Sequence, residues 1–269
     1  NSGVAEVTTS LPFGASTKAA DFEASESDFM SAADSASLSL NSPLSIEFWV
    51  KFESTPSSGN NYSLVTKWNH EGTGTTDRSY ALFLINSAGT LKIEWDTSSN
   101  GGNSGVTVGL WNWTPTTGTW YHVALTLSGG TATLYIDGTS QGTQTSQNTT
   151  IYNGTQTFYL GAVGNGSGGQ SNNLDGILDE VRLWSAARTE ANIDDNMSLQ
   201  LAGNESNLVA YWPFNALGSP SSSVSPSVSP SASVSPSASQ SPSSSSSASV
   251  SPSASVSPSS SVSLSVSPS

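Results

Sequence analysis

Between Thr17 and Trp212 the chain consists of short runs in which apolar and polar residues alternate, separated by turn-forming residues. A period of two places every second side chain on the same face of an extended segment, so each alternating run predicts a β-strand, and the wholly apolar run 80–85 predicts a buried one. Gly129-Gly130 and Asp137-Gly138 each follow such a run and are typical of tight hairpin turns. The runs are residues 44–52, 80–85, 91–95, 120–127, 131–136, 158–161, 176–184 and 208–212. The pattern favours an all-β fold of antiparallel strands.

One segment near the end of this region differs from the others. Thr189 can cap the N-terminus of a helix and acidic residues follow it in the first turns, so we expect one short helix from Thr189 to Leu199. Many antiparallel strands, one late helix and about 200 residues indicate a two-sheet sandwich or jelly roll.

Several stretches of the chain resemble laminin-G-like domains. They are residues 18–22, 34–40, 46–51, 118–124, 134–138, 174–184 and 210–214, which read KAADF, DSASLSL, IEFWVK, GTWYHVA, LYIDG, LDGILDEVRLW and AYWPF. In order and spacing they cover residues 17–215. The resemblance implies a concanavalin A-like jelly-roll sandwich of two curved antiparallel sheets. That fold serves lectins, adhesion modules, spacers and hydrolases, so the function must be inferred from particular residues.

The composition changes abruptly after residue 218. All charged and all aromatic residues lie before that point, whereas residues 219–269 contain 30 Ser and 8 Pro and cannot bury enough apolar surface to form a core. We therefore expect three parts. Residues 1–16 are an N-terminal arm or first strand, residues 17–215 are the jelly roll, and residues 216–269 are a Ser/Pro-rich extended tail.

The tail follows a rule of register, because Ser occupies every odd position from Ser219 to Ser269. In an extended chain this period directs all of these Ser to one side and Val, Pro and Ala to the other. Outward Ser at every second residue suits dense O-glycosylation. The first candidate sites are Ser219, Ser221, Ser223, Ser225, Ser227, Ser229, Ser231, Ser233 and Ser235. The alternative is a dipeptide expansion without structural meaning.

Charge and cysteine content exclude several partners. The formal net charge is −13 and would repel a nucleic-acid backbone, and no run of about 18 apolar residues is present to insert into a membrane. Without cysteine, disulfides, thiol nucleophiles and Cys-type zinc sites are excluded.

The absence of cysteine, the high content of Thr, Ser, Asn and Gly, and recurring sequons predict a secreted protein, extracellular or at the cell surface. The sequence starts at Asn1 rather than Met, as after removal of a signal peptide, although a trimmed chain is the alternative. N-glycosylation sequons recur. The candidate sites are Asn61, Asn112, Asn148, Asn153 and Asn165, with two further sequons at Asn196 and Asn204.

We expect no catalytic activity. His122 lies within a predicted strand and His70 in a polar loop, and no Ser-His-Asp arrangement is evident around either. Hydrolases of the laminarinase type, which share the implied fold, carry a strand motif E-x-D-x-x-E. Glu94 and Asp96 come nearest to it, but no third acid follows at the required spacing.

Acidic residues gather in an early and a late cluster, and calcium prefers several oxygen ligands. The resemblance implies a structural Ca²⁺ held by the first strand and by the Asp of the Asp-Glu-Val-Arg stretch. The corresponding residues are Asp21, Asp28 and Asp179. A solvated acidic face is the alternative.

Trp111 and Trp113 flank Asn112 near a loop and are candidates for a glycan-binding platform, since aromatic faces stack on sugar rings. Packing at the rim of the core is the alternative. The Trp residues within predicted strands are expected in the core.

Two functions follow. The first is a non-catalytic, secreted structural subunit of an extracellular filament or surface layer, which assembles with copies of itself through its arm or tail and is O-glycosylated on the tail. Strand addition at an open sheet edge is one physical route to such a homo-polymer. The alternative is a carbohydrate-binding or adhesion module on a Ser/Pro stalk.

Overall fold

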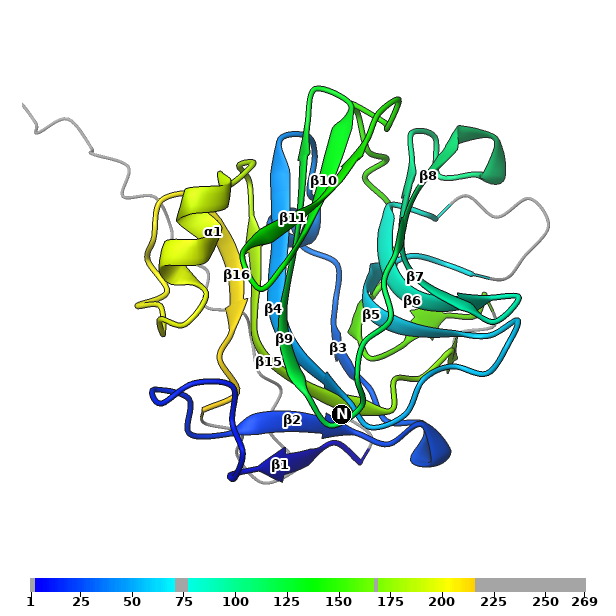
Figure 1. Ribbon diagram of the computed structural model, residues 1–269. Coiled ribbons are helices and arrows are strands. Elements are labelled where there is room, and N and C mark those ends of the chain that lie inside the picture. Colours follow the sequence, from blue (N-terminus) through cyan, green and yellow to red (C-terminus); the bar gives the residue numbers. More distant parts are fainter. Residues whose placement is uncertain (1–2, 71–76, 167–168, 216–269) are drawn as a thin grey trace, which may run out of the picture. The chain divides into compact units, whose positions relative to one another are not determined.

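Two antiparallel sheets face each other across one hydrophobic core in residues 3–70, 77–166 and 169–215, which are the residues that the computed structural model describes (Figure 1). The tail and its predicted O-glycosylation sites lie outside the described residues. The predicted jelly roll of two antiparallel sheets with one short helix is confirmed in these residues.

The larger sheet has eight strands in the order β1-β2-β15-β4-β9-β10-β11, and β16 also pairs with β15. Their bounds are β1 (Ala5–Val7), β2 (Ala19–Phe22), β4 (Leu44–Phe52), β9 (Trp120–Ser128), β10 (Thr131–Ile136), β11 (Thr139–Gln144), β15 (Gly176–Trp184) and β16 (Leu208–Trp212).

The smaller sheet has six strands in the order β3-β12-β5-β6-β7-β8. Their bounds are β3 (Met30–Ala32), β5 (Asn61–Lys67), β6 (Tyr80–Ser87), β7 (Thr90–Ser98), β8 (Val106–Asn112) and β12 (Phe158–Leu160). The other elements are the hairpin β13 (Val163–Gly164) and β14 (Gln170–Ser171), the 3-10 turns η1 (Ala24–Glu26), η2 (Ala36–Leu38) and η3 (Asn103–Gly105), and the helix α1 (Glu190–Asn196).

The strands predicted from alternation are present, and β4 and β16 have the predicted bounds. The helix begins after Thr189, whose side chain accepts a hydrogen bond from the backbone N–H of Asn192, as expected for an N-cap. Strands β3, β5, β8, β11, β13 and β14 were not anticipated. β11 is the clearest case, since its polar residues are nearly all exposed and carry no alternation.

The core shows why the alternating runs became strands. On β4 the side chains of Ile46, Phe48 and Val50 belong to the hydrophobic core, and the residues between them point to the outer face. Phe158 of the smaller sheet stacks on Trp212 of the larger sheet at a centroid distance of 5.1 Å. Burial of such side chains stabilises the sandwich by about 1.5–3 kcal/mol each.

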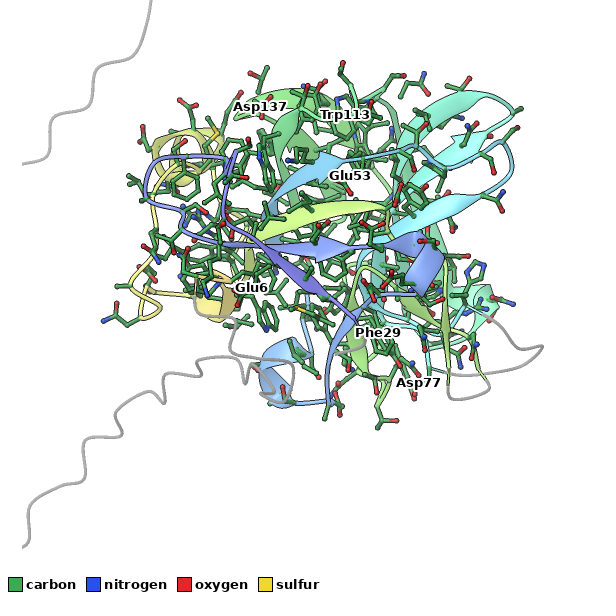
Figure 2. The ribbon with its side chains drawn as sticks, turned by 90° about the horizontal axis from the view of Figure 1, so that it is seen from below. Glu6, Phe29, Glu53, Asp77, Trp113 and Asp137 are labelled. Atoms are coloured by element: carbon green, nitrogen blue, oxygen red, sulfur yellow. The ribbon has the colours of Figure 1, made fainter. Side chains whose placement is uncertain are left out.

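The described part of the leader packs on its own domain. β1 pairs with β2 at the sheet edge, and the indole N–H of Trp120 donates to the carbonyl of Ser10. Phe13 contacts the ring of Trp49 at 6.1 Å, so the leader covers part of the outer face of the larger sheet. Figure 2 shows the domain from the side on which β1 and β2 lie. In the described residues, no helix is long and apolar enough to span a membrane.

Candidate functional site

Alternation also determines the outer face of the larger sheet, where it places charged side chains. Register sets Glu47 of β4 opposite Arg182 of β15, and Trp49 of β4 opposite His122 of β9. Glu47, His122 and Arg182 are each at most 1% exposed. Charged groups removed from water require partners of opposite charge or hydrogen bonds, so this face must be covered by polar groups.

The segment 185–207, which contains α1, supplies that cover. The guanidinium of Arg182 donates to the backbone carbonyls of Asn196 at 3.0 Å and of Leu199. The indole N–H of Trp49 donates to the carbonyl of Met197 at 2.8 Å. Carbonyl groups at and beyond the C-terminal end of α1 therefore receive donors from the sheet, which fastens the helix to it.

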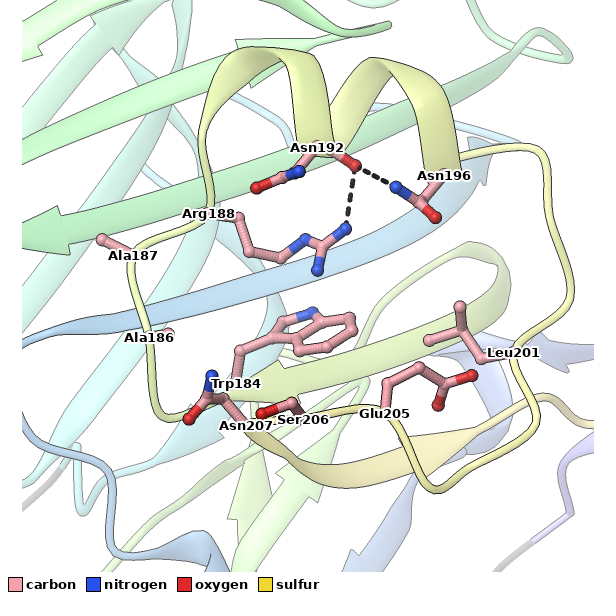
Figure 3. Close-up of a pocket in the computed structure, with 10 residues that line it drawn as sticks. All are labelled: Trp184, Ala186, Ala187, Arg188, Asn192, Asn196, Leu201, Glu205, Ser206 and Asn207. Carbon is pink, nitrogen blue, oxygen red and sulfur yellow. Dashed lines mark hydrogen bonds between the residues drawn. The ribbon is translucent and has the colours of Figure 1, made fainter.

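A pocket of about 340 Å³ lies beside α1 (Figure 3). It is lined by Trp184, Ala186, Ala187, Arg188, Asn192, Asn196, Leu201, Glu205, Ser206 and Asn207. The guanidinium carbon of Arg188 lies 4.0 Å from the centre of the Trp184 ring. The backbone carbonyl of Asn192 accepts hydrogen bonds from Arg188 and from the Asn196 amide, both at 2.8 Å. Arg188 is thus held between the Trp184 ring and the Asn192 carbonyl.

The pocket lining is rich in groups that pair with hydroxyls. Asn192, Ser206 and Asn207 are exposed and offer amide and hydroxyl groups, which both donate and accept hydrogen bonds. The carboxylate of Glu205 accepts from the backbone N–H groups of Ala202 and Gly203, which shapes the loop at the pocket rim. A small neutral polyol fits this chemistry better than an apolar ligand does.

A buried carboxylate lies beneath the pocket. Oε1 of Glu47 is 2.7 Å from Nε of Arg188, an ion-pair distance without the alignment of a hydrogen bond. Burial raises the pKa of Glu47 to about 7, although Arg188 and Arg182 act in the opposite direction. Burial and the same two arginines lower the pKa of His122 to about 3, so its imidazole is neutral and forms no ion pair with Glu47 at neutral pH.

A bulge in β15 brings a second carboxylate to Arg182. The β15–β4 register shifts between Asp179 and Arg182, and Glu180 within the shift has a φ of 52°. Glu180 accepts from Arg182 at 2.9 Å and from the Tyr211 hydroxyl at 2.5 Å. This network was not expected from the sequence, because the strand pattern of residues 176–184 gives no sign of a bulge.

Three carboxylates at the end of β2 and β4 meet the geometric requirement of a cation site. The ligand oxygens of Asp21, Glu23 and Glu53 lie within 4.8 Å of one another, and Oδ1 of Asp21 is buried without a hydrogen-bond partner. Burial raises the pKa of Asp21, Lys51 lowers it, and Asp175 raises it further. Figure 2 labels Glu53. An all-oxygen donor set of this kind fits calcium.

The three residues predicted to hold calcium are not brought together as a set. Asp28 is 2% exposed and accepts from the backbone N–H of Glu23, which places it next to the carboxylate cluster. Asp179 instead accepts from the Ser16 hydroxyl at 2.5 Å and from the Glu180 N–H at 2.8 Å. One oxygen of Asp179 thus binds the leader and the other binds the bulge. Asp179 is therefore not part of the carboxylate cluster near Asp21 and Asp28.

Glu53 was not among the ligands predicted from the sequence. Its proximity to Asp21 and Glu23 follows from the strand order, since Phe22 of β2 and Phe52 of β4 are both paired with Gly176 of β15. Glu23 and Glu53, the residues that follow them, therefore leave the sheet at the same place. That strand order is a tertiary property.

Trp111 and Trp113 do not form an open platform. Trp111 is 4% exposed, lies in the core and donates its indole N–H to the Gly142 carbonyl at 2.9 Å. Trp113 is half-buried and meets Tyr121 and Phe52 edge-on at 5.1 and 6.1 Å. Trp111 at the end of β8 and Trp113 just after it are two positions apart, so both rings lie on the core side. They pack at the core and its rim, as in the alternative to a platform.

The Asn residues of the predicted sequons differ in exposure and in hydrogen bonding. The Asn148 amide donates to the carbonyls of Thr97 and Gly105 at 3.0 and 2.9 Å, so it is engaged inside the fold and is a poor acceptor for a glycan. Asn112 and Asn153 are exposed, whereas Asn61 is half-buried in β5. Oδ1 of Asn165 accepts from the Gly169 N–H at 3.0 Å.

A family model described as the concanavalin A-like lectin/glucanases superfamily matches residues 24–194. No curated protein matches the chain.

Among solved structures, a putative carbohydrate binding protein from Bacteroides ovatus is 20% identical with a TM-score of 0.55, and the match covers 73% of this chain and 51% of that one. Domain 4 of AbnA, an extracellular arabinanase from Geobacillus stearothermophilus in complex with arabinotriose, is 21% identical with a TM-score of 0.53, covering 72% and 81%. The ligand binding domain of botulinum neurotoxin serotype D, in complex with N-acetylneuraminic acid, is 16% identical with a TM-score of 0.51, covering 76% and 48%. At these identities the likeness shows the fold.

Proposed function

This chain belongs to the concanavalin A-like lectin/glucanase superfamily, and we propose that it is a carbohydrate-binding domain that holds a short neutral glycan in the pocket beside α1. The observation that carries the proposal is the pocket itself, whose lining combines amide, hydroxyl, carboxylate and guanidinium groups around an ordered Arg188. Such groups match the paired hydroxyls of a sugar.

The similar structures support binding over assembly. A putative carbohydrate binding protein and a domain in complex with arabinotriose share the fold, which favours the carbohydrate-binding alternative over a filament or surface-layer subunit. A role outside the cell is part of the same proposal. Self-assembly remains a prediction.

The experiment is titration calorimetry with arabinotriose, after a glycan array has shown which other neutral sugars bind. The test variant is Asn192→Ala with Ser206→Ala, both exposed residues of the pocket lining. The matched control is Asp195→Ala with Asn204→Ala, which are exposed residues on the same helix and in the same loop but outside the lining. We expect the test variant to bind at least tenfold more weakly and the control to bind as the parent does. Equal affinity in all three proteins would contradict the pocket assignment.

A structural Ca²⁺ at Asp21, Glu23 and Glu53 is the second element of the proposal. Support comes from their mutual proximity and from the unpartnered oxygen of Asp21. In that position the ion would join the ends of β2 and β4 and offset the repulsion between the carboxylates.

A further inference from the structure

The segment 185–207 is held to the rest of the domain by polar contacts rather than by the core. Ile193 is the one buried residue of this fully described segment, and none of its residues belongs to a hydrophobic cluster of the core. Parts of a protein with few buried apolar contacts open at a lower free energy than the whole domain unfolds. The segment therefore has the composition of a locally opening unit.

The two ends of the segment lie together. The backbone N–H of Ser185 donates to the carbonyl of Asn207 at 2.9 Å. Just outside these ends, β15 and β16 are paired with each other, as Leu183 with Ala210. A loop whose ends are close can leave the surface without unpairing the strands on either side of it.

The contacts that fasten the segment surround one buried carboxyl group, that of Glu47. The hydroxyl of Ser45, two positions away on the same face of β4, donates to the Ala186 carbonyl and accepts from the Arg188 N–H, both at 2.8 Å. The hydrogen bonds from the sheet to the C-terminal end of α1 lie on the other side of the carboxyl group. Closure of the segment thus removes Glu47 from water.

Each element packed against Glu47 brings a titratable group to it. Nη1 of Arg182 on β15 and Nε2 of His122 on β9 each lie 3.8 Å from Oε2. Nε of Arg188, in the segment itself, lies 2.7 Å from Oε1. Arg188 is therefore the charged group that Glu47 loses when the segment opens, whereas Arg182 and His122 stay on the sheet.

Two further titratable groups belong to the sheet and remain paired there. Glu180 accepts hydrogen bonds from Arg182 and from the Tyr211 hydroxyl, and all three residues lie on β15 and β16. Burial raises the pKa of Glu180, and its bonds to Tyr211 and Arg182 oppose that change. Because these contacts do not involve the segment, Glu180 is less sensitive than Glu47 to its opening.

Protonation of Glu47 favours the closed segment. Burial raises the pKa of Glu47 from 4.5 to about 7, although Arg188 and Arg182 act in the opposite direction. Burial also lowers the pKa of His122 to about 3, so His122 does not titrate in this range. Opening returns Glu47 to water and to its ordinary pKa. The closed state therefore holds a proton that the open state releases, and its advantage is lost as the pH rises through 7.

We propose that the segment 185–207 is a proton-controlled cover, which lies closed on the larger sheet while Glu47 is protonated and opens more often once Glu47 is ionised. Apart from Trp184, every residue that lines the pocket beside α1 belongs to this segment, so opening removes the pocket (Figure 3). A ligand in the pocket then holds the segment closed. This last consequence, unlike the opening itself, rests on the proposed function.

The test is hydrogen exchange of the full chain at pH 6, 7 and 8, followed by mass spectrometry and expressed as protection factors, which remove the intrinsic effect of pH. We expect peptides from residues 185–207 to lose about tenfold in protection between pH 6 and 8, as a change in the pKa of Glu47 between about 7 and 4.5 requires. Peptides from β4 and β9 should stay better protected than the segment at every pH.

Two variants assign the effect to one group. Glu47→Gln keeps the size of the side chain but cannot ionise, so the protection of the segment should no longer depend on pH. Asp179→Asn is the matched control, because burial also raises the pKa of Asp179 to about 7 but its partner is Ser16 of the leader. The control should keep the tenfold change.

Other results would overturn the inference. Protection of the segment that is constant or rises from pH 6 to 8 shows that no such proton is released, and a Glu47→Gln protein with the parent's pH dependence assigns it to another group. Exchange of the segment only together with β4 and β9 shows that it does not open separately. Excess arabinotriose should increase the protection of the segment. A pH-dependent opening that the sugar leaves unchanged supports the cover and contradicts the pocket as a glycan site.

Discussion

Nε of Arg188 lies 2.7 Å from Oε1 of Glu47, a carboxylate with no exposed surface, and this contact joins the pocket beside α1 to the buried face of the larger sheet. Arg188 stacks on Trp184 at the pocket and meets Glu47 beneath it. A buried carboxyl group therefore contacts, from beneath, the arginine that lines the pocket.

Glu47→Ala should destabilise the domain by about 3 kcal/mol, because it removes the buried carboxyl group that Arg188 and Arg182 approach and leaves a cavity in its place. Chemical denaturation followed by tryptophan fluorescence measures the free energy of unfolding. Asp195→Asn, an exposed residue of α1, is the control and should change it by less than about 0.5 kcal/mol. A Glu47→Ala protein as stable as the parent would contradict the network described here.

Stability should increase as the pH falls from 8 to 5. The folded-state pKa values of Glu47 and Asp179 are raised to about 7 and that of Asp96 to about 8, all above their ordinary values. The folded state then binds more protons than the unfolded chain across this window, so this stability is fully present at low pH and is lost as the pH rises through 7 to 8. Unfolding free energies at pH 5, 6, 7 and 8 measure the slope, and Glu47→Gln should flatten it. A stability that rises with pH over this range would refute the prediction.

Ser16→Ala should cost about 1–3 kcal/mol, because it removes the donor to Oδ2 of Asp179 and leaves a buried carboxyl oxygen unpaired. Thermal unfolding measures the loss. Thr9→Ala is the control, since Thr9 is exposed in the same leader and should have little effect. Equal melting temperatures for the Ser16 variant and the parent would show that the leader does not depend on this contact.

Calcium should raise the melting temperature if Asp21, Glu23 and Glu53 hold the ion. A ligand at about one hundred times its dissociation constant stabilises the folded state by about 2.7 kcal/mol, which is several degrees for a domain of this size. The comparison is excess Ca²⁺ against EDTA, with Asp21→Asn and, as the control, Asp179→Asn. The Asp21 variant should lose the shift and the Asp179 variant should keep it. No shift in the parent protein would discard the site.

Self-assembly is tested by deletion of residues 219–269. If the tail joins copies of the chain, the full-length protein forms polymers under the electron microscope and the deleted protein does not. The described leader residues pack on their own domain, so we expect the tail rather than the leader to carry any assembly. Monomers from both proteins would leave binding as the function of the domain.

Much of the fold could be predicted from local pattern, and much of the site could not. The run 44–52 became β4 with the predicted bounds because its inward residues alternate without a break, although its outer face is buried as well. β11 was missed because its residues are polar and nearly all exposed, so that only pairing with β10 makes it a strand. Trp111 is a platform candidate by sequence because it lies near a loop, whereas the register of β8 turns it into the core.

By itself, the sequence determined the all-β class, the N-cap at Thr189 and the alternation that divides inner from outer faces, since these depend on residues close in the chain. Tertiary structure alone decided which distant groups meet. Glu47 faces Arg182 and Arg188 because β4 lies beside β15, and Glu53 joins Asp21 and Glu23 because both of their strands flank the start of β15. Strand order and the bulge at Glu180 arise from long-range pairing, which no local pattern records.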